Sequence, residues 1–291
     1  MKLRSNKITK GIAFAGCSFT WGQGLHYYSN LPSLVELPLN IYDSNFLEFS
    51  HREFICVNRF ARRVANYFNT FELVKYENGG SLDAIIDYWK GLAFDPTTAR
   101  SLAREQNPNF RGYNPSDIGY FILQCTSWTR TNISINEDNI NIPCQQLWKL
   151  LEDNKDELLL VLQKRNSSLN DFLVQQKKLD VERYKDLLIY LENLGIKTLI
   201  MTWPEDLAAF ILSDPWLAPK IIKFNYLGIE YNSIETLIDY NSGLTINTDY
   251  QTFEVPPTDN HPSLLCHKII AENIINSIAK EKYDRTTTNT L

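Results

Sequence analysis

The chain has 291 residues, of which 44% are hydrophobic and 22% are charged, and its formal net charge is −5. This is ordinary globular composition, and the length suits one large domain or two small ones and is ample for a substantial core. Apart from Lys2, Arg4, Lys7 and Lys10 at the start, which are typical of a solvated terminus, the basic residues are scattered, and this disfavours a nucleic-acid-binding surface. No apolar run approaches the ~20 residues that span a bilayer, so we expect no transmembrane segment and no membrane partner.

Five cysteines stand far apart in the sequence and form no CxxC pair. This spacing disfavours both a disulfide framework and a zinc site, and it indicates reduced thiols in a cytoplasmic protein. The charged first residues are not followed by the apolar core of a signal peptide, which agrees with that location. We therefore expect no metal and no cofactor.

Four short apolar runs, rich in β-branched and aromatic residues, predict buried strands. These runs are Gly11–Ala15, Phe71–Tyr76, Ile118–Gln124 and Ile196–Thr202. Segments with a helical period lie between and after them, at residues 52–68, 81–94, 179–195 and 262–281. Strands that alternate with helices predict an α/β fold in which helices cover both faces of a parallel sheet. The carboxyl ends of such strands form the usual ligand crevice.

The predicted helices carry recognisable stripes and end signals. The helix expected at 52–68 has an apolar stripe of Phe54, Val57, Ala61, Val64 and Phe68, with Phe60 and Tyr67 at its margin. The third predicted helix stops at Gly195, and the last begins with Pro262, a favourable residue for a first turn.

Three longer stretches, at 26–51, 95–116 and 204–257, are rich in Pro, Asn, Tyr and Asp and do not fit a minimal α/β unit. Loops of this length inside a compact domain usually serve function, so we interpret them as insertions around the crevice. We expect a single domain over residues 1–283 that carries these insertions, and a flexible tail over residues 284–291.

The stretch GIAFAGCSFTWGQGL, residues 11–25, joins the first predicted strand to a glycine-rich turn. Its candidate reactive groups are Cys17, Ser18 and Thr20. A serine hydroxyl becomes a nucleophile only when a base takes its proton, and a carboxylate usually orients that base. Near the other end of the chain, Asp259 and His261 stand together in the sequence PPTDNHPS.

Each of these pieces alone has a simpler interpretation. An Asp-x-His-Pro sequence is also typical of an aspartate that caps a helix beside a surface histidine, and Gly-Cys-Ser is typical of a tight turn. Cys17 is a rival nucleophile, because a thiolate is intrinsically more reactive than a hydroxyl. His267 and Cys266 fall within the predicted last helix, where we expect packing and no zinc site.

Together, the motifs resemble the SGNH hydrolases, also called the GDSL family. GCSFTWGQG is similar to the family's first block, YENGGSLDAII to its glycine block and DNHPS to its last block, in the same order over nearly the whole chain. The resemblance implies a three-layer α/β/α domain with a flavodoxin-like parallel sheet of about five strands. It implies Ser18 as nucleophile, His261 as base and Asp259 as the residue that orients the imidazole. It also implies an oxyanion hole formed by the backbone N–H groups of Ser18 and of Gly79 or Gly80.

Two features depart from the family pattern. Asp259 and His261 are two positions apart where the family has three, and this shorter form resembles that of some phage-encoded and bacterial relatives. The asparagine donor expected after the third strand is absent, because this strand ends in QCTSWTRTN. We expect Thr126, Ser127 or Arg130 to supply a replacement donor, since an unreplaced donor costs about 3 kcal/mol of transition-state stabilisation. The simpler interpretation of this segment is a loop whose tryptophan packs on the sheet edge.

These observations predict a serine-dependent ester hydrolase that removes an acyl group from a carbohydrate or another small ester, with Arg130 and Trp21 as substrate contacts. The alternative is a non-catalytic SGNH-like module that binds glycan as a virion or surface component, which the missing asparagine favours. The Asn-, Ile- and Tyr-rich composition is typical of an AT-rich genome and indicates a phage protein, cytoplasmic or assembled into the virion. A nucleotide binder is disfavoured, because the chain has no Walker motif and its glycine spacing does not match the dinucleotide fingerprint.

Overall fold

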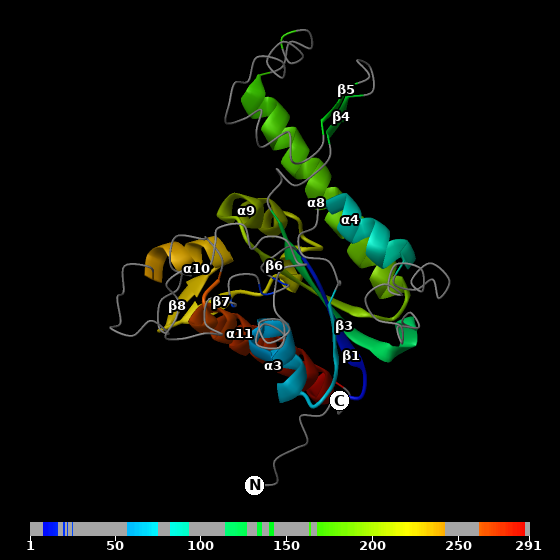
Figure 1. Ribbon diagram of the computed structural model, residues 1–291, viewed down its shortest axis with the longest axis vertical. Coiled ribbons are helices and arrows are strands. Elements are labelled where there is room, and N and C mark those ends of the chain that lie inside the picture. The colour runs from blue at the N-terminus through cyan, green and yellow to red at the C-terminus, as the bar shows by residue number, and fades with distance from the viewer. Residues whose placement is uncertain are drawn as a thin grey trace, which may run out of the picture.

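The computed structural model describes residues 8–16, 20, 22, 25, 57–74, 82–92, 114–126, 133–135, 140–142, 163, 168–241 and 262–288. Within this part of the chain, four parallel strands form one sheet that lies between two layers of helices (Figure 1). The α/β fold class predicted from the sequence is confirmed.

The sheet has the strand order β2-β1-β3-β6, and every pair of neighbours is parallel. The strands are β1 (Gly11–Ala15), β2 (Glu72–Val74), β3 (Ile118–Cys125) and β6 (Lys197–Thr202). Beyond β6, Ile221 forms a single parallel bridge with Ile200, on the side where a fifth strand would lie. The order of the four strands is that of a flavodoxin-like sheet. Because all of them run in one direction, their carboxyl ends share one edge of the sheet.

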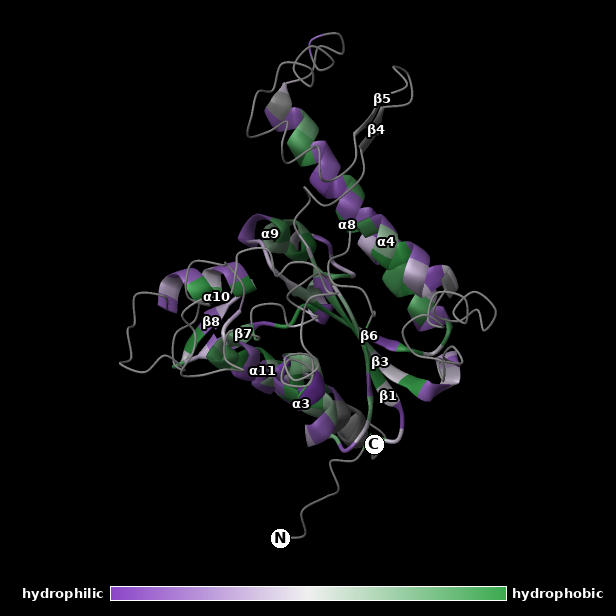
Figure 2. Cartoon of the chain, in the orientation of Figure 1, coloured by the Kyte–Doolittle hydropathy of each residue, from purple (hydrophilic) through white to green (hydrophobic). Residues whose placement is uncertain are grey.

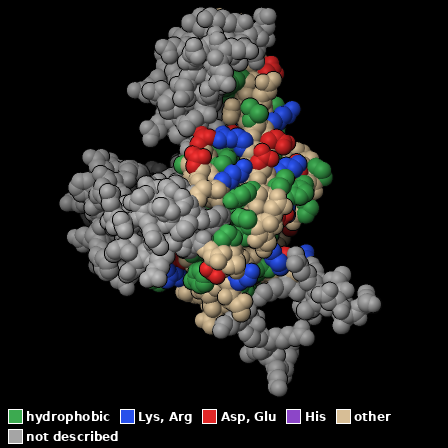
Figure 3. All heavy atoms as spheres, turned by 90° about the vertical axis from the view of Figure 1, so that its right-hand side faces the viewer, with side chains coloured by type: hydrophobic (Ala, Val, Ile, Leu, Met, Phe, Trp, Pro, Cys, Tyr) green, Lys and Arg blue, Asp and Glu red, His purple; other side chains and the backbone are tan. Residues whose placement is uncertain are grey.

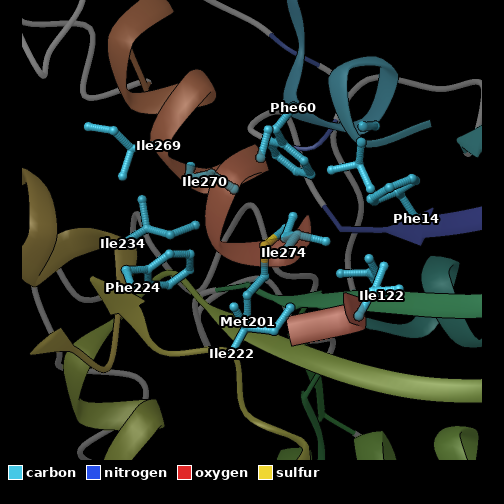
Figure 4. Close-up of a cluster of buried hydrophobic side chains, with 14 of the residues drawn as sticks. Phe14, Phe60, Ile122, Met201, Ile222, Phe224, Ile234, Ile269, Ile270 and Ile274 are labelled. Atoms are coloured by element: carbon cyan, nitrogen blue, oxygen red, sulfur yellow. The ribbon is translucent and has the colours of Figure 1, made fainter. Parts of the chain in front are cut away.

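One face of the sheet packs against three helices through a continuous apolar core. These helices are α3 (Phe60–Tyr67), α10 (Ile234–Asn241) and α11 (Leu264–Thr288). Phe14 of β1, Ile122 of β3 and Met201 of β6 all point into this core (Figure 4). Alternate residues of each strand contribute to it, as the period of two of a strand requires.

The opposite face packs against a second set of helices. They are α4 (Leu82–Asp87), α8 (Leu169–Asn193) and α9 (Glu205–Ser213). Ala13 of β1, together with Phe121 and Leu123 of β3, lies in this second core. The strands are therefore apolar on both faces, which Figure 2 shows as green strands between amphipathic helices.

Helix α3 differs in phase from the prediction. Phe60, which we placed at the margin of the stripe, is fully buried, whereas Val57, which we placed on it, is 52% exposed. The reason is that Arg59 has an extended backbone, with φ −62° and ψ 149°, so the helix starts at Phe60. Val57 precedes this break and does not share the helical phase.

Helix α8 begins earlier than the sequence predicts and ends where the sequence predicts. Ser168 caps its first turn by accepting a hydrogen bond from the Asp171 N–H at 3.1 Å. The helix ends before Gly195, which has φ +80°, the left-handed conformation that glycine adopts at low cost. Within the predicted helix at 81–94, α4 passes into a π-helical turn at Tyr88–Leu92.

Much of the predicted insertion at 204–257 has regular structure. Residues 204–241 contain α9, a 3₁₀ turn at Ala218–Lys220, a hairpin and α10. The hairpin strands are β7 (Phe224–Tyr226) and β8 (Ile229–Tyr231), and its two turn residues, Leu227 and Gly228, both have positive φ. Two positive φ values are the signature of a type I′ turn. Most of the other two predicted insertions, and residues 242–257, lie outside the described residues.

Three further features complete the fold. A second hairpin pairs β4 (Ile133–Ile135) with β5 (Ile140–Ile142), and a 3₁₀ turn at Pro115–Asp117 leads into β3. Helix α11 continues to Thr288, so its last turns lie in the segment for which the sequence predicts a flexible tail. Among the described helices, none has the length and apolar character that crossing a membrane requires. On the face shown in Figure 3, acidic and basic side chains are intermingled over the described surface.

Candidate active site

The exit of β1 is the first element of the candidate site. Gly16 directly follows the strand, and Thr20 is the next residue that the structure describes. The Thr20 hydroxyl donates a hydrogen bond of 2.6 Å to Oε1 of Gln124, and both side chains are buried. Of the three candidate reactive groups in this turn, Thr20 is therefore a poor nucleophile, because its hydroxyl is enclosed and already bonded.

The exit of β3 is held by a tyrosine from α8. The backbone N–H of Thr126, the first residue after the strand, donates to the Tyr184 hydroxyl at 3.1 Å. Thr126 is the one predicted oxyanion-hole residue within the described part of the chain, and it is 1% exposed. Tyr184 thus fixes the backbone at the carboxyl end of β3.

A buried acidic group lies beneath this exit. Asp180 is 1% exposed, and its Oδ1 accepts a hydrogen bond of 3.1 Å from Nε2 of Gln176, one turn earlier on α8. Burial raises the pKa of the Cys125 thiol well above its ordinary value, and the negative charge of Asp180 raises it further. Burial likewise raises the pKa of Tyr184, with smaller contributions from Cys125 and Asp180. Both groups therefore stay protonated at neutral pH.

The start of α11 closely follows the Asp-x-His-Pro motif in the sequence. Ser263 is fully buried, and its hydroxyl accepts a hydrogen bond of 3.1 Å from the Cys266 N–H, which makes Ser263 the N-cap of the helix. The sequence left open a capping role for Asp259. The residue that caps the helix at the Cys266 N–H is Ser263.

A chain of three rings links the entrance of α11 to the exit of β1. The Phe14 and Phe60 rings lie edge to face with centroids 5.9 Å apart, and Phe60 stacks on His267 at 5.5 Å. His267 also accepts the Phe60 N–H at Nδ1, at 3.2 Å. Phe14 precedes Ser18 by four positions, and His267 follows His261 by six. The segments that lead to the two predicted catalytic residues are therefore linked through Phe60 of α3, on one face of the sheet.

His267 and Cys266 serve the core, as expected from the sequence. Both are fully buried, and burial raises the pKa of the Cys266 thiol well above its ordinary value. Within the described ranges, no three His, Cys, Asp or Glu side chains gather in a way that would hold a metal ion.

The other predicted site residues lie outside the described residues, and their roles stay predictions. They are Ser18, Asp259 and His261 of the triad, Gly79, Gly80 and Ser127 of the oxyanion hole, Trp21 and Arg130 as substrate contacts, and the rival nucleophile Cys17.

Sequence reasoning missed the residues that support the strand exits. Gln124 is a polar residue near the end of an otherwise apolar strand, and this break in the pattern was a usable signal. Asp180 and Tyr184 stand four residues apart, in phase with the buried residues Leu187 and Leu191 of α8. A polar pair on an apolar stripe of this kind points to a buried interaction.

No protein-family model matches the chain, and no curated protein has a significantly similar sequence. A solved structure of a carbohydrate esterase, whose active site is described as displaying divergent catalytic and non-catalytic binding functions, is similar in fold. The similarity covers 94% of this chain and 69% of that chain, with a TM-score of 0.40 and 12% sequence identity. A similarity of this size assigns neither a family nor an activity to the chain.

Proposed function

We propose that the protein is a serine-dependent ester hydrolase with a triad of Ser18, His261 and Asp259. The proposal starts from the order of the motifs along the observed sheet. The serine motif follows β1, the glycine block follows β2, and the Asp-x-His-Pro motif precedes α11. In parallel sheets, the residues that follow the strands' carboxyl ends are the ones that meet a ligand.

The observation that carries the proposal is the ring chain Phe14–Phe60–His267. It links the start of α11 to β1 through Phe60 of α3, although Phe60 and His267 are 207 positions apart in the sequence. A nucleophile and its base need this proximity, because proton transfer takes place within hydrogen-bond reach. The N-cap at Ser263 also supports the proposal. Because Ser263 accepts the Cys266 N–H, Asp259 is not needed as the cap at that amide.

The proposed reaction is acyl transfer to Ser18 followed by hydrolysis. Ser18 Oγ attacks the ester carbonyl while His261 takes its proton, and His261 then returns a proton to the leaving alcohol. Backbone N–H groups of Ser18 and Gly79 or Gly80 stabilise the oxyanion, and each such donor is worth about 10²–10³ in rate. Water then attacks the acyl-enzyme with His261 again as base. The substrate proposed is an O-acyl carbohydrate or another small ester.

The test is covalent labelling by a fluorophosphonate, which requires an activated hydroxyl but no matched substrate. We expect a single adduct on Ser18, located by mass spectrometry, and no adduct in Ser18→Ala. Cys17→Ala is the matched control, because it changes the neighbouring nucleophile and should still take the label. Hydrolysis of p-nitrophenyl acetate should rise with pH as the imidazole base loses its proton.

A glycan-binding module without catalysis is the second candidate. The observation that favours it is the sequence QCTSWTRTN at the exit of β3, which has no asparagine where the family places its donor. A folded protein in which Ser18 takes no label, and whose esterase rate equals that of Ser18→Ala, would favour this candidate over the hydrolase.

A further inference from the structure

The turn that follows β1 is tied to β3 by a buried hydrogen bond. Thr20 Oγ1 donates to Gln124 Oε1 at 2.6 Å, and the exposed fractions of these two residues are 2% and 0%. A hydrogen bond between buried neutral groups has no competition from water, so it restrains both partners strongly. This bond anchors the chain at Thr20 to a strand 104 positions further along.

The other end of the turn is held against the same side chain. A Cβ atom on Gly16 would lie 2.7 Å from Gln124 Oε1 and closer still to Thr20 Oγ1. Both distances are too short for a carbon and an oxygen that are not bonded to each other, so a side chain at position 16 would displace the Thr20–Gln124 bond. Gly16, Thr20 and Gln124 are thus packed together, and Cys17, Ser18 and Phe19 stand between Gly16 and Thr20 in the sequence.

The contact lies on the face of the sheet that α3 and α11 cover. Gln124 is two residues after Ile122, so it shares the face on which Ile122 meets these helices. The neighbouring position, Cys125, belongs to the core of the opposite face. The Thr20–Gln124 bond therefore lies on the side of the sheet that α11 covers.

We propose that Thr20 and Gln124 are positioning residues, which hold the turn containing Ser18 in its reactive geometry. This inference rests on the proposed function. A nucleophile has to stay within a few tenths of an ångström of its attack position, and a displacement of about 1 Å costs on the order of 10²-fold in rate. In this proposal the Thr20 hydroxyl acts only through its hydrogen bond to Gln124 and takes no part in the chemistry.

The experiment compares Thr20→Val with Thr20→Ser in the full chain. Valine keeps the volume and removes the hydroxyl, whereas serine keeps the hydroxyl. We expect the second-order rate constant for fluorophosphonate labelling of Ser18 to fall by about tenfold or more in Thr20→Val. In Thr20→Ser the rate should stay within about twofold of wild type, because the bond is retained.

Two further readouts separate positioning from a loss of fold. With p-nitrophenyl acetate, Thr20→Val should lower kcat and leave both KM and the pH midpoint unchanged, since His261 is not altered. Thr198→Val is the matched control: it removes a buried hydroxyl of β6 whose hydrogen bond, at 2.6 Å, goes to Glu192. It should lower the melting temperature and leave the labelling rate unchanged.

Gln124→Met removes the acceptor of the same hydrogen bond, and it replaces Thr20→Val in the experiment if that variant does not fold. The double variant should label no more slowly than either single variant, because one bond is lost in all three. Labelling of Thr20→Val or Gln124→Met at the wild-type rate, with wild-type Ser18 reactive, would overturn this inference alone. Wild-type Ser18 that takes no label would overturn both this inference and the proposed function.

Discussion

Several residues in this protein make interactions that cannot be inferred from the residues next to them in the sequence. His267 stands beside Cys266 in a helix, a pairing that invites a metal-binding interpretation. In the structure its Nδ1 accepts the first N–H of α3, an amide for which Arg59 at the N-cap provides no side-chain acceptor. A histidine from the last helix thus completes the cap of a helix early in the chain.

We expect His267→Leu to lower the free energy of unfolding by about 1–3 kcal/mol, because it leaves the buried Phe60 N–H without this acceptor. His267→Asn is the control, since its amide oxygen can take the position of Nδ1 while the stacking on Phe60 is lost in both variants. Urea denaturation measures the difference. Equal stability of the two variants would show that packing, and not the hydrogen bond, is the contribution of His267.

The candidate site could be predicted as a set of motifs but not as a structure. Ser18, Asp259 and His261 were identified because short motifs occur in a recognisable order. Gln124 and Tyr184 were not identified, because their partners are 104 and 58 positions away and no local pattern encodes a contact over that distance.

At the scale of elements, the predictions held where periodicity was strong. β1 spans the predicted residues, and β3 and β6 differ from theirs by one residue at one end, because buried strands of a parallel sheet are continuous apolar runs. The hairpin β7–β8 was missed, because its turn is Leu227-Gly228 and lacks the Asn-Gly or Asp-Gly signal. α9 and α10 were not predicted, because both helices are short and lie among residues typical of loops.

α8 offers a test of how an element supports the site. Tyr184→Phe removes the hydroxyl that accepts the Thr126 N–H, and we expect a loss of about 1–3 kcal/mol in the free energy of unfolding. Tyr190→Phe is the matched control on the same helix, because its hydroxyl bonds the Lys90 carbonyl in an exposed position where water replaces it. The control should change stability by less than about 0.5 kcal/mol. Similar losses in both variants would contradict the role assigned to Tyr184.

At the scale of the whole molecule, two buried thiols and one buried phenol make the free energy of unfolding depend on pH. Burial raises the pKa values of the Cys125, Cys266 and Tyr184 side chains in the folded state. A raised pKa in the folded state gives stability that is complete below the unfolded value and declines as pH rises above it. For a thiol the unfolded value is about 8.5, so the decline should begin there.

We expect the free energy of unfolding to be level near about pH 7 and to fall at higher pH, by about 1.4 kcal/mol per pH unit for each buried thiol. Urea denaturation in the presence of a reductant, from about pH 7 to about pH 10, measures this slope. The variant Cys125→Ala/Cys266→Ala should show a smaller slope, because two of the three groups are gone. An unchanged slope in that variant would contradict the assignment.

The hydrogen bond between Phe60 and His267 also has a consequence for synthesis. Because the two residues are 207 positions apart, a chain emerging from the ribosome exposes the apolar face of β1 and β3 until α11 has been made. Domains generally fold as units during translation, and exposed apolar surface of this kind is prone to aggregation. Because α11 is made last, we expect the core on this face of the sheet to close only when α11 arrives, after the Asp259–His261 motif has been synthesised.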